Sequence, residues 1–447
     1  MNLVDTVNKL DLDADWFGLR EYRENTTYHV IRDKKPLTNE TSIDHGLMVE
    51  VLKDGQFGYC GTSDLSLNGI QKAANNALDS AAKASKHSVF SFNNSVRPGS
   101  KGEYITPLEL PFDSLSAGEI NDILMKANEW LLVDDRIMSV SAMAMLVETS
   151  INYACSNGSD IRQKMNIVGS DYSATAKNGN IIQTRTDGRS GNQMGLERFN
   201  QDLVREKCNK VSTQVIELIE ADQCPTGTMS LVLAPDQMML QIHESIGHPL
   251  EIDRILGDER NYAGWSFVRL EDFGKLKYGS DIMNVTFDPT ISNEMASYMF
   301  DDGGMTAKKE YLIKEGLLLR GLGGMESQSR SETPAVANFR ASSWNRAPID
   351  RMANLNLEPG SSTFDDMISS VERGVYVETN RSWSIDDYRN KFQFGMEYGK
   401  LIKNGKLTKT IRNPNYRAVT TPFWNNLKMV GDKSTFEVFG TPNCGKG

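Results

Sequence analysis

The sequence has few cysteines and no long apolar run, and each shortage excludes a class of protein. Disulfide-stabilised secreted domains carry a dense, even set of cysteines, so an odd and scattered set indicates a reducing compartment. No apolar run approaches the ~20 residues that a membrane-spanning helix needs, and we expect no transmembrane segment. The 5 cysteines among the 447 residues are Cys60, Cys155, Cys208, Cys224 and Cys444.

Basic residues are also in the minority. The 49 Lys and Arg residues face 59 Asp and Glu residues, which gives a net charge of -10 at pH 7. Nucleic-acid binding relies on clustered positive charge, so we expect no direct nucleic-acid partner. The first residues, Met1 to Asp5, lack the basic and apolar regions of a secretory signal. Together with the few cysteines, this predicts a cytoplasmic protein.

The first half of the sequence alternates hairpin patterns with helical patterns, which predicts a mixed α/β domain over residues 1–222. Asp-Gly and Asn-Gly pairs predict a hairpin over 47–59 and an antiparallel meander over 137–183, because these residues tolerate the positive φ angles of tight turns. Residues 88–111 read as irregular. Apolar spacing predicts helices over about 66–86 and 200–221. The capping-box pattern from Ser116 to Glu119 predicts the start of a further helix, which extends to about 132. The expected core face of the helix over 200–221 consists of Leu203, Val211, Val215 and Leu218.

The second half, residues 223–447, reads as a β-rich C-terminal domain that begins after a boundary near 222–228. Short strand-like runs are separated by glycine pairs, and Asn404-Gly405 marks another hairpin. One conspicuous helix lies at the start of this half. The sequence therefore predicts an α+β fold, with an N-terminal mixed α/β domain followed by the β-rich domain.

That helix carries the one motif with clear catalytic chemistry. Residues 243–248 read His-Glu-Ser-Ile-Gly-His, after a strand that ends near Leu233 and a proline at the first helical position. Imidazole is a good zinc ligand, and a carboxylate beside the metal can accept a proton from bound water. The motif predicts a hydrolytic zinc site with His243 and His248 as ligands and Glu244 as the general base.

The spacing of the two histidines requires a break in the helix. Residues i and i+5 lie about 140° apart around a regular α-helix, so they point in different directions. Gly247 permits a left-handed helix end, and Pro249 disfavours the helical conformation for His248. We expect the helix to end near Gly247 so that His248 turns back towards His243. A π-bulge is the alternative.

The third zinc ligand is not settled by spacing. A catalytic zinc usually has three protein ligands and one open position. Glu251 and Asp253 are nearby candidates, and Cys444 is a distant one. Residue chemistry alone favours Glu251, because two histidines and a glutamate are a common peptidase set.

Several segments of the second half resemble the TldD/PmbA family of metallopeptidases, also described as modulators of DNA gyrase. The resemblance is clear over about 230–447 and looser over the first half. Because the chain keeps His243, Glu244 and His248, it resembles the catalytic TldD-type subunit; the PmbA (TldE) type lacks this motif. The matching segments are 243–253 (HESIGHPLEID), 301–304 (DDGG) followed by 312–318 (LIKEGLL), 346–360 (RAPIDRMANLNLEPG) and 444–447 (CGKG).

The resemblance implies that Cys444 is the third ligand of Zn²⁺, with Glu251 in a supporting role. Thiolate is a good zinc ligand, which agrees with this assignment. The resemblance also implies a working dimer, either a homodimer or a heterodimer with a PmbA (TldE)-type subunit. Family members usually continue past the Cys-Gly-Lys segment, whereas three residues follow Cys444 here.

The function predicted from these observations is zinc-dependent cleavage of unfolded polypeptides or peptides. The alternatives are a non-catalytic regulatory or binding subunit, and a metal-dependent hydrolase of a non-peptide substrate. An exposed sheet edge near the metal is a candidate for binding an extended peptide as an added strand. Arginines that are candidates for binding a peptide carboxylate are Arg340, Arg346 and Arg351. The histidines expected to be structural are His29, His45 and His87.

Overall fold

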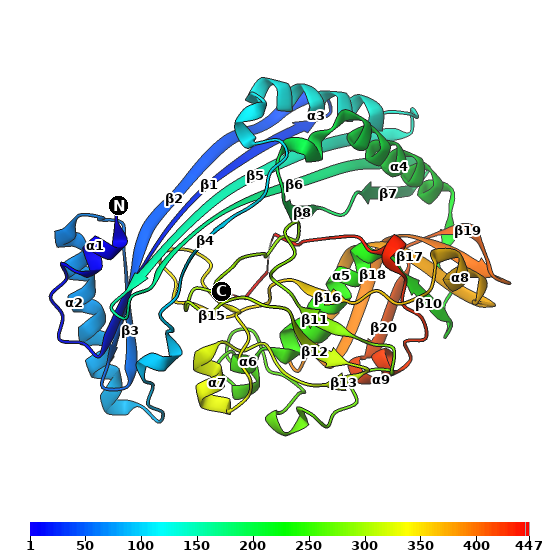
Figure 1. Ribbon diagram of the computed structural model, residues 1–447. Helices are drawn as coiled ribbons and strands as arrows, with labels where there is room; N and C mark the ends of the chain where they lie inside the picture. The colour runs from blue at the N-terminus through cyan, green and yellow to red at the C-terminus, as the bar shows by residue number, and fades with distance from the viewer. Residues whose placement is uncertain (443, 447) are drawn as a thin grey trace.

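The first half of the chain forms a long, curved sheet that arches over the second half (Figure 1). The computed structural model describes residues 1–442 and 444–446; Asn443 and Gly447, the last residue of the CGKG segment, lie outside the described residues. The strand order is β3-β2-β1-β5-β6-β4, with β7 and β8 also paired to β6, and only the β4–β6 pairing is parallel among these described strands. The strands are β1 (Trp16–Arg32), β2 (Lys35–Lys53), β3 (Gln56–Thr62), β4 (Lys101–Ile105), β5 (Ile137–Cys155), β6 (Asp160–Asn178), β7 (Ile181–Thr186) and β8 (Ser190–Gln193).

Helices cover the two ends of this sheet and create two separate cores. Helix α2 packs on β2 and β3 at one end, where small alanines of the helix meet leucine and valine of β2. Helices α3 and α4 lie on the outer face at the other end, above β1, β5 and β6 (Figure 1). The helices of this half are α1 (Leu3–Val7), α2 (Leu67–Ala84), α3 (Ala117–Leu131) and α4 (Gln201–Glu220).

The second half contains two principal sheets. The larger has the order β10-β17-β18-β19-β9, with β20 also on β18, and the smaller has the order β13-β12-β11-β16. Its strands are β9 (Asp222–Gln223), β10 (Ser230–Leu233), β11 (Val285–Phe287), β12 (Glu310–Lys314), β13 (Leu317–Leu318), β14 (Phe339–Arg340), β15 (Ile349–Asp350), β16 (Leu355–Leu357), β17 (Arg373–Ile385), β18 (Lys391–Lys403), β19 (Lys406–Arg412) and β20 (Asn415–Val419). Its helices are α5 (Pro235–Ile242), α6 (Ile252–Leu256), α7 (Met325–Ser331), α8 (Phe364–Ser369) and α9 (Thr420–Asn425).

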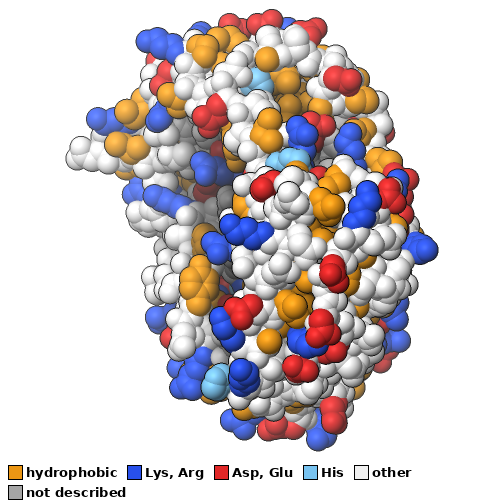
Figure 2. Space-filling view, turned by 90° about the vertical axis from the view of Figure 1, so that its left-hand side faces the viewer, with side chains coloured by type: hydrophobic (Ala, Val, Ile, Leu, Met, Phe, Trp, Pro, Cys, Tyr) orange, Lys and Arg blue, Asp and Glu red, His pale blue; other side chains and the backbone are white. Residues whose placement is uncertain are grey.

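The predicted α+β class is confirmed, and so are the predicted tight turns. Asp-Gly and Asn-Gly pairs join β2 to β3, β5 to β6, β6 to β7 and β18 to β19, and each pair supplies at least one positive φ angle. In the described part of the chain no helix combines the length and the apolar character needed to cross a bilayer. Acidic and basic side chains are interspersed over the face of the molecule drawn in Figure 2.

Two details of the sequence interpretation are wrong, and one element was missed. Leu203 was expected in the core, but it is 40% exposed at the start of α4. Strand β4 lies within the stretch expected to be irregular. The long hairpin of β1 and the first part of β2 was not predicted, because most side chains of residues 35–45 are exposed and show no alternating pattern.

Two buried arginines join the halves of the chain. Arg97 is 1% exposed; its Nε lies 3.1 Å from Glu50 in β2, and its Nη2 donates to Glu326 in α7 at 2.5 Å. Arg185 in β7 donates to Glu378 in β17 at 2.8 Å and to Glu397 in β18 at 3.0 Å. Buried ion pairs of this kind are sensitive to the loss of either partner. These ion pairs hold the curved sheet of the first half against the second half. Residues of both halves line a cavity, which is described below.

The close approach of strand β3 to helix α2 generates a stability prediction. A Cβ added at Gly58 would lie 2.7 Å from the Ala81 nitrogen and would also meet the Ala77 carbonyl oxygen, both of which are backbone atoms. Gly58→Ala should lower the free energy of unfolding by about 1–3 kcal/mol, because the helix must move away. The matched control is Gly118→Ala in α3, where the added Cβ has room and should leave stability equal or up to ~1 kcal/mol higher. Chemical denaturation of both variants measures the difference, and equal stability would contradict the packing described.

Candidate metal centre

A π-helical turn at the end of α5 brings the two histidines of the motif together. Helix α5 starts at Pro235 directly after β10 and passes into a π turn, His243–Gly247, followed by a 3₁₀ turn, His248–Leu250. A π turn has i→i+5 hydrogen bonding, and here the His248 N–H donates to the His243 carbonyl. Residues five apart therefore lie above each other, and the two imidazole rings are 4.7 Å apart between centroids.

The expectation that the helix ends near Gly247 is wrong. Gly247 has φ -57° and ψ -66°, which is right-handed, so it does not end the helix in the left-handed conformation. The π-bulge alternative describes the structure, and the return of His248 towards His243 occurs by this route. Proline at position 249 is accommodated because it lies in the first turn of the 3₁₀ segment.

The third side chain of the cluster comes from the far end of the sequence. Cys444 Sγ lies 3.6 Å from His248 Nε2, and one ligand atom each of His243, His248 and Cys444 lie within 4.8 Å of one another. Ligand atoms around a tetrahedral zinc are about 3.3–3.8 Å apart, given bonds of ~2.0–2.3 Å. Small side-chain movements therefore suffice for these three residues to fit a zinc ion. The described residues contain no other such group of His, Cys, Asp and Glu.

The surroundings favour the thiolate form of Cys444, which is the form that binds metal. Burial raises the pKa of the thiol, but hydrogen bonds and charge from His243 and His248 outweigh burial and bring the pKa to about 5. Burial lowers the pKa of His248, whereas Glu251 and Cys444 raise it, and the resulting pKa is about 8.

Glu251 lies on the far side of the His248 ring from Cys444. Its Oε2 is 3.0 Å from His248 Nδ1, so the other ring nitrogen, Nε2, is directed towards the thiol. Such a carboxylate contact fixes the orientation and tautomer of a ligating histidine. Burial raises the pKa of Glu251, but Lys446 and His248 outweigh it, and the pKa falls well below its ordinary value.

Lys446 fixes the C-terminal tail, and sequence reasoning did not single it out. The residue is 2% exposed, and its Nζ lies 3.2 Å from Glu251 and 2.7 Å from Asp253. Asp253 is held in turn by its backbone N–H, which donates to Asp350 at 3.2 Å. The two acidic residues first considered as ligands thus bind the lysine that follows Cys444.

Glu244 has a partner that is remote in sequence. It is 5% exposed, and its Oε2 accepts a hydrogen bond of 2.7 Å from Arg389 Nη1. Arg389 lies in the turn between β17 and β18, with φ +61°, and its Nη2 donates to the Ala263 carbonyl at 3.1 Å. Because 145 residues separate the two side chains and only folding brings them together, no sequence signal identified Arg389.

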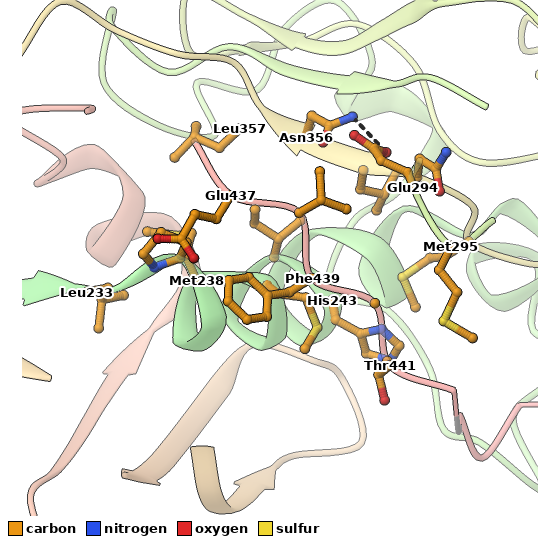
Figure 3. Close-up of a pocket in the computed structure, with 18 of the residues that line it drawn as sticks. Leu233, Met238, His243, Glu294, Met295, Asn356, Leu357, Glu437, Phe439 and Thr441 are labelled. Carbon is orange, nitrogen blue, oxygen red and sulfur yellow. Dashed lines mark hydrogen bonds between the residues drawn. The ribbon is translucent and has the colours of Figure 1, made fainter. Parts of the chain in front are cut away.

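The cluster opens into a cavity of about 1570 Å³. His243 and Met238 of α5 line it from one side, and Figure 3 shows the C-terminal segment passing across the cavity with Phe439 and Thr441 beside them. Strand β10 also lines it. In the described sheet β10 pairs with β17 alone, so its other edge has no strand partner.

The other predicted positions lie outside this cluster. His29 is buried and its Nδ1 lies 3.0 Å from the Asn121 side chain, while His45 lies 3.1 Å from Glu21. His87 is exposed. These surroundings agree with structural roles for the remaining histidines.

Comparison with known proteins identifies the class of protein. The model described as "PmbA/TldA metallopeptidase C-terminal domain" matches residues 226–445, and that described as "PmbA/TldA metallopeptidase domain 1" matches residues 19–81. The chain belongs to the PmbA/TldD metallopeptidase family, as the resemblance predicted.

Relatives across bacteria and archaea carry protease names. A protein named "Metalloprotease TldD homolog" from Haemophilus influenzae is 26% identical, and the match covers 100% of this chain and 91% of that protein. A metalloprotease of Methanocaldococcus jannaschii is 24% identical, with 92% and 88% covered. A protein of Saccharolobus solfataricus named "Zinc metalloprotease TldD homolog" is 19% identical, with 90% and 85% covered.

Solved structures share the fold. TldE from Thermococcus kodakarensis superimposes with a TM-score of 0.75 at 15% identity, covering 96% of this chain and 93% of that chain. A Bacteroides thetaiotaomicron protein described as a candidate modulator of DNA gyrase gives a TM-score of 0.75 at 18% identity, with 96% and 92% covered. At these identities the likeness shows a common fold.

The ion pairs of Lys446 generate a prediction about metal affinity. Lys446→Met should weaken zinc binding by about 10- to 100-fold, because the tail that carries Cys444 loses its buried attachment and Glu251 loses a partner. The matched control is Lys433→Met, an exposed lysine of the same C-terminal segment. Competition with a chromophoric chelator measures both affinities. Equal zinc affinity in the Lys446 variant and the unaltered chain would show that the tail does not depend on this lysine.

Proposed function

We propose that the chain is a zinc-dependent peptidase that cleaves unfolded polypeptides or peptides. His243, His248 and Cys444 hold the zinc, and Glu244 is the general base. The observation that carries this proposal is the convergence of two imidazoles and a thiol, with ligand atoms within 4.8 Å, beside a buried glutamate. The metalloprotease names of relatives agree with it.

The donor set fits a catalytic zinc. His243, His248 and Cys444 would hold the ion and leave one coordination position to water, and the zinc would lower the pKa of that water and polarise the scissile carbonyl. Glu251 keeps His248 in the tautomer whose Nε2 faces the metal position. Lys446 keeps the cysteine in place by neutralising the acidic residues behind it.

Glu244 is arranged to move a proton. Arg389 holds its Oε2, and among the described residues Oε1 has no hydrogen-bond partner, so this oxygen can accept a proton from water. The same carboxyl then donates the proton to the leaving amine, as a general acid. A carboxylate held by a guanidinium in a buried setting stays oriented through both steps.

The unpaired edge of β10 is the proposed binding surface for the peptide. An extended peptide that adds to a sheet edge satisfies its backbone hydrogen bonds whatever its side chains are. The cavity of about 1570 Å³ exceeds the ~300–1,000 Å³ of ordinary small-molecule sites, which suits a length of chain. A folded domain does not present a free backbone to such an edge, so we propose unfolded substrates.

We propose further that the working unit is a dimer, either of two copies or of this chain with a PmbA (TldE)-type subunit, in the cytoplasm. The likeness to TldE supports a partner of that fold. The division into domains at 1–222 and 223–447 remains part of this proposal. A purely regulatory role is less well supported, because metal binding alone needs no general base held by an arginine.

The role of Glu244 is tested by replacing its carboxylate with an amide. Glu244→Gln should retain one zinc per chain and lower the cleavage rate of an unstructured substrate such as casein by at least ~100-fold, because the general base is lost. Metal analysis and the cleavage rate are measured on the same sample. The control is Glu332→Gln on the exposed C-terminal end of α7. Undiminished cleavage by the Glu244 variant would remove the proposed mechanism.

The third ligand is tested separately by its metal content. Cys444→Ala should lose most of the bound zinc, because two imidazoles alone bind zinc weakly, whereas Cys224→Ala should keep it. Elemental analysis after dialysis measures both. Zinc retained in full by the Cys444 variant would reject this ligand. If the unaltered chain is inactive alone, the assays are repeated with a PmbA-type subunit added.

A further inference from the structure

Two of the three arginines named from the sequence line the same cavity as the candidate metal ligands His243 and Cys444. Arg340 and Arg351 line it together with His243 and Cys444, whereas Arg346 is exposed and does not line the cavity. The two residues come from neighbouring backbone segments, since β14 and β15 pair with each other. The cavity therefore has cationic groups on the wall beside the proposed ligands.

The two cavity arginines differ in what they bind. The Arg340 guanidinium lies over the ring of Tyr298 at 5.4 Å and donates a hydrogen bond to the Met352 carbonyl. Arg351 is held through its backbone, whose N–H donates to the Asn338 carbonyl at 3.0 Å. Within residues 1–442 and 444–446, its guanidinium makes no hydrogen bond and no ion pair. The guanidinium nitrogens are not fully buried, and Arg351 lines the cavity, so these nitrogens are accessible from it.

The negative groups near Arg351 are already engaged elsewhere. Burial and the neighbouring Arg340 lower the pKa of Arg351, while Cys444, Glu251 and Asp302 act in the opposite direction. Glu251 binds His248 and Lys446, and Asp302 accepts a hydrogen bond of 2.7 Å from the Ala341 N–H. Arg351 is thus a partly buried cation whose guanidinium has no hydrogen-bond acceptor in the part of the chain that the structure describes.

This arrangement differs from that of the structural arginines. Arg97 and Arg185 are buried as well, but each donates to carboxylates and to further oxygens of the protein. A guanidinium has five N–H donors in a planar fork that matches a carboxylate. A fork left open towards a cavity is suited to an anion brought in from outside.

We propose that Arg351, with Arg340 beside it, forms a carboxylate-binding subsite for the peptide next to the metal cluster. This inference rests on the proposed peptidase function and names a feature of the substrate. The carboxylate comes either from the C-terminus of the peptide or from an aspartate or glutamate side chain. Two parallel hydrogen bonds to the guanidinium fix its position relative to the bond at the metal.

A C-terminal carboxylate is the source that agrees best with the rest of the cavity. The β10 edge binds backbone and reads no side chain, and every peptide has a C-terminal carboxylate whatever its sequence. Recognition of both features together directs cleavage to short peptides and to chain ends without selecting a sequence.

Binding of matched peptides to the zinc-loaded Glu244→Gln chain tests the subsite. Three fluorescent peptides of one sequence are compared: the free acid, its C-terminal amide, and the amide with one internal glutamine replaced by glutamate. The free acid should bind at least ~10-fold more tightly than the amide, because a charge-assisted pair is lost on amidation. Recovery of affinity by the glutamate-containing amide would assign the subsite to side chains instead.

Variants at Arg351 and Arg346 test whether the difference in affinity between the free acid and the amide depends on Arg351. In the Glu244→Gln background, Arg351→Gln should abolish the difference between acid and amide, Arg351→Lys should retain part of it, and Arg346→Gln should leave it unchanged. Thermal unfolding shows whether each variant is folded. Equal binding of all three peptides in the presence of Arg351 would overturn the proposal, as would an Arg351→Gln variant that weakens acid and amide equally.

The same peptides separate this inference from the proposed function. Cleavage of acid and amide at equal rates by the unaltered, zinc-loaded chain, with equal binding, rejects the carboxylate subsite and leaves the peptidase standing. Absence of cleavage both by the chain alone and with a PmbA-type subunit added, together with an Arg351-dependent preference for the acid, rejects the peptidase and leaves a carboxylate-binding site.

Discussion

The arrangement of the candidate metal centre depends on the burial of one lysine near the end of the chain. Lys446 places its ammonium between Glu251 and Asp253, and all three side chains are almost completely removed from solvent. Buried charges are tolerated only when they are paired and hydrogen-bonded, so the tail has one favourable position. That position sets the thiol of Cys444 beside the imidazole of His248. The ion pairs of Lys446 thereby bring Cys444 to the two histidines. Glu251 has two roles, because it pairs with Lys446 and also orients His248.

The helix that carries the motif is adapted to the same arrangement. A regular α-helix would direct His243 and His248 to different faces, and the π turn removes this difference by adding one residue to the turn. Glu244, between them in sequence, points instead to Arg389 on the β17–β18 turn. Two imidazoles thus face the C-terminal tail, while the carboxylate is held from the larger sheet. The proposed metal ligands and the proposed general base are thus held by different parts of the fold.

The curved sheet gives this site its setting. Arg97 and Arg185 connect the sheet to the second half at separate places, and the space between the halves remains open as the cavity. The cavity is lined by an edge of β10 and by the Arg351 guanidinium, neither of which has a partner among the described residues, and by the candidate metal ligands His243 and Cys444. These three features are suited to the backbone, a carboxylate and the scissile bond of one extended peptide. Under the proposed function, such a site would recognise what all peptides share and would depend little on their side chains.

Elements with strong local signals could be predicted from the amino-acid sequence alone. Asn157-Gly158 predicted a tight turn because its backbone preferences are local, and Ser116 with Glu119 predicted the start of α3 for the same reason. The His-Glu-x-x-x-His motif predicted a zinc site, and the resemblance of distant segments implied Cys444 as its third ligand. The folded structure was needed to show that a π turn brings the histidines together, that Arg389 holds Glu244, and that Lys446 anchors the tail. The contacts of Arg389 and Lys446 join residues far apart in the chain, and their energy arises from charges paired away from water, so no local sequence pattern predicts them. The π turn is local, but the spacing of the two histidines agrees equally with a helix end, and only the packed structure distinguishes the two.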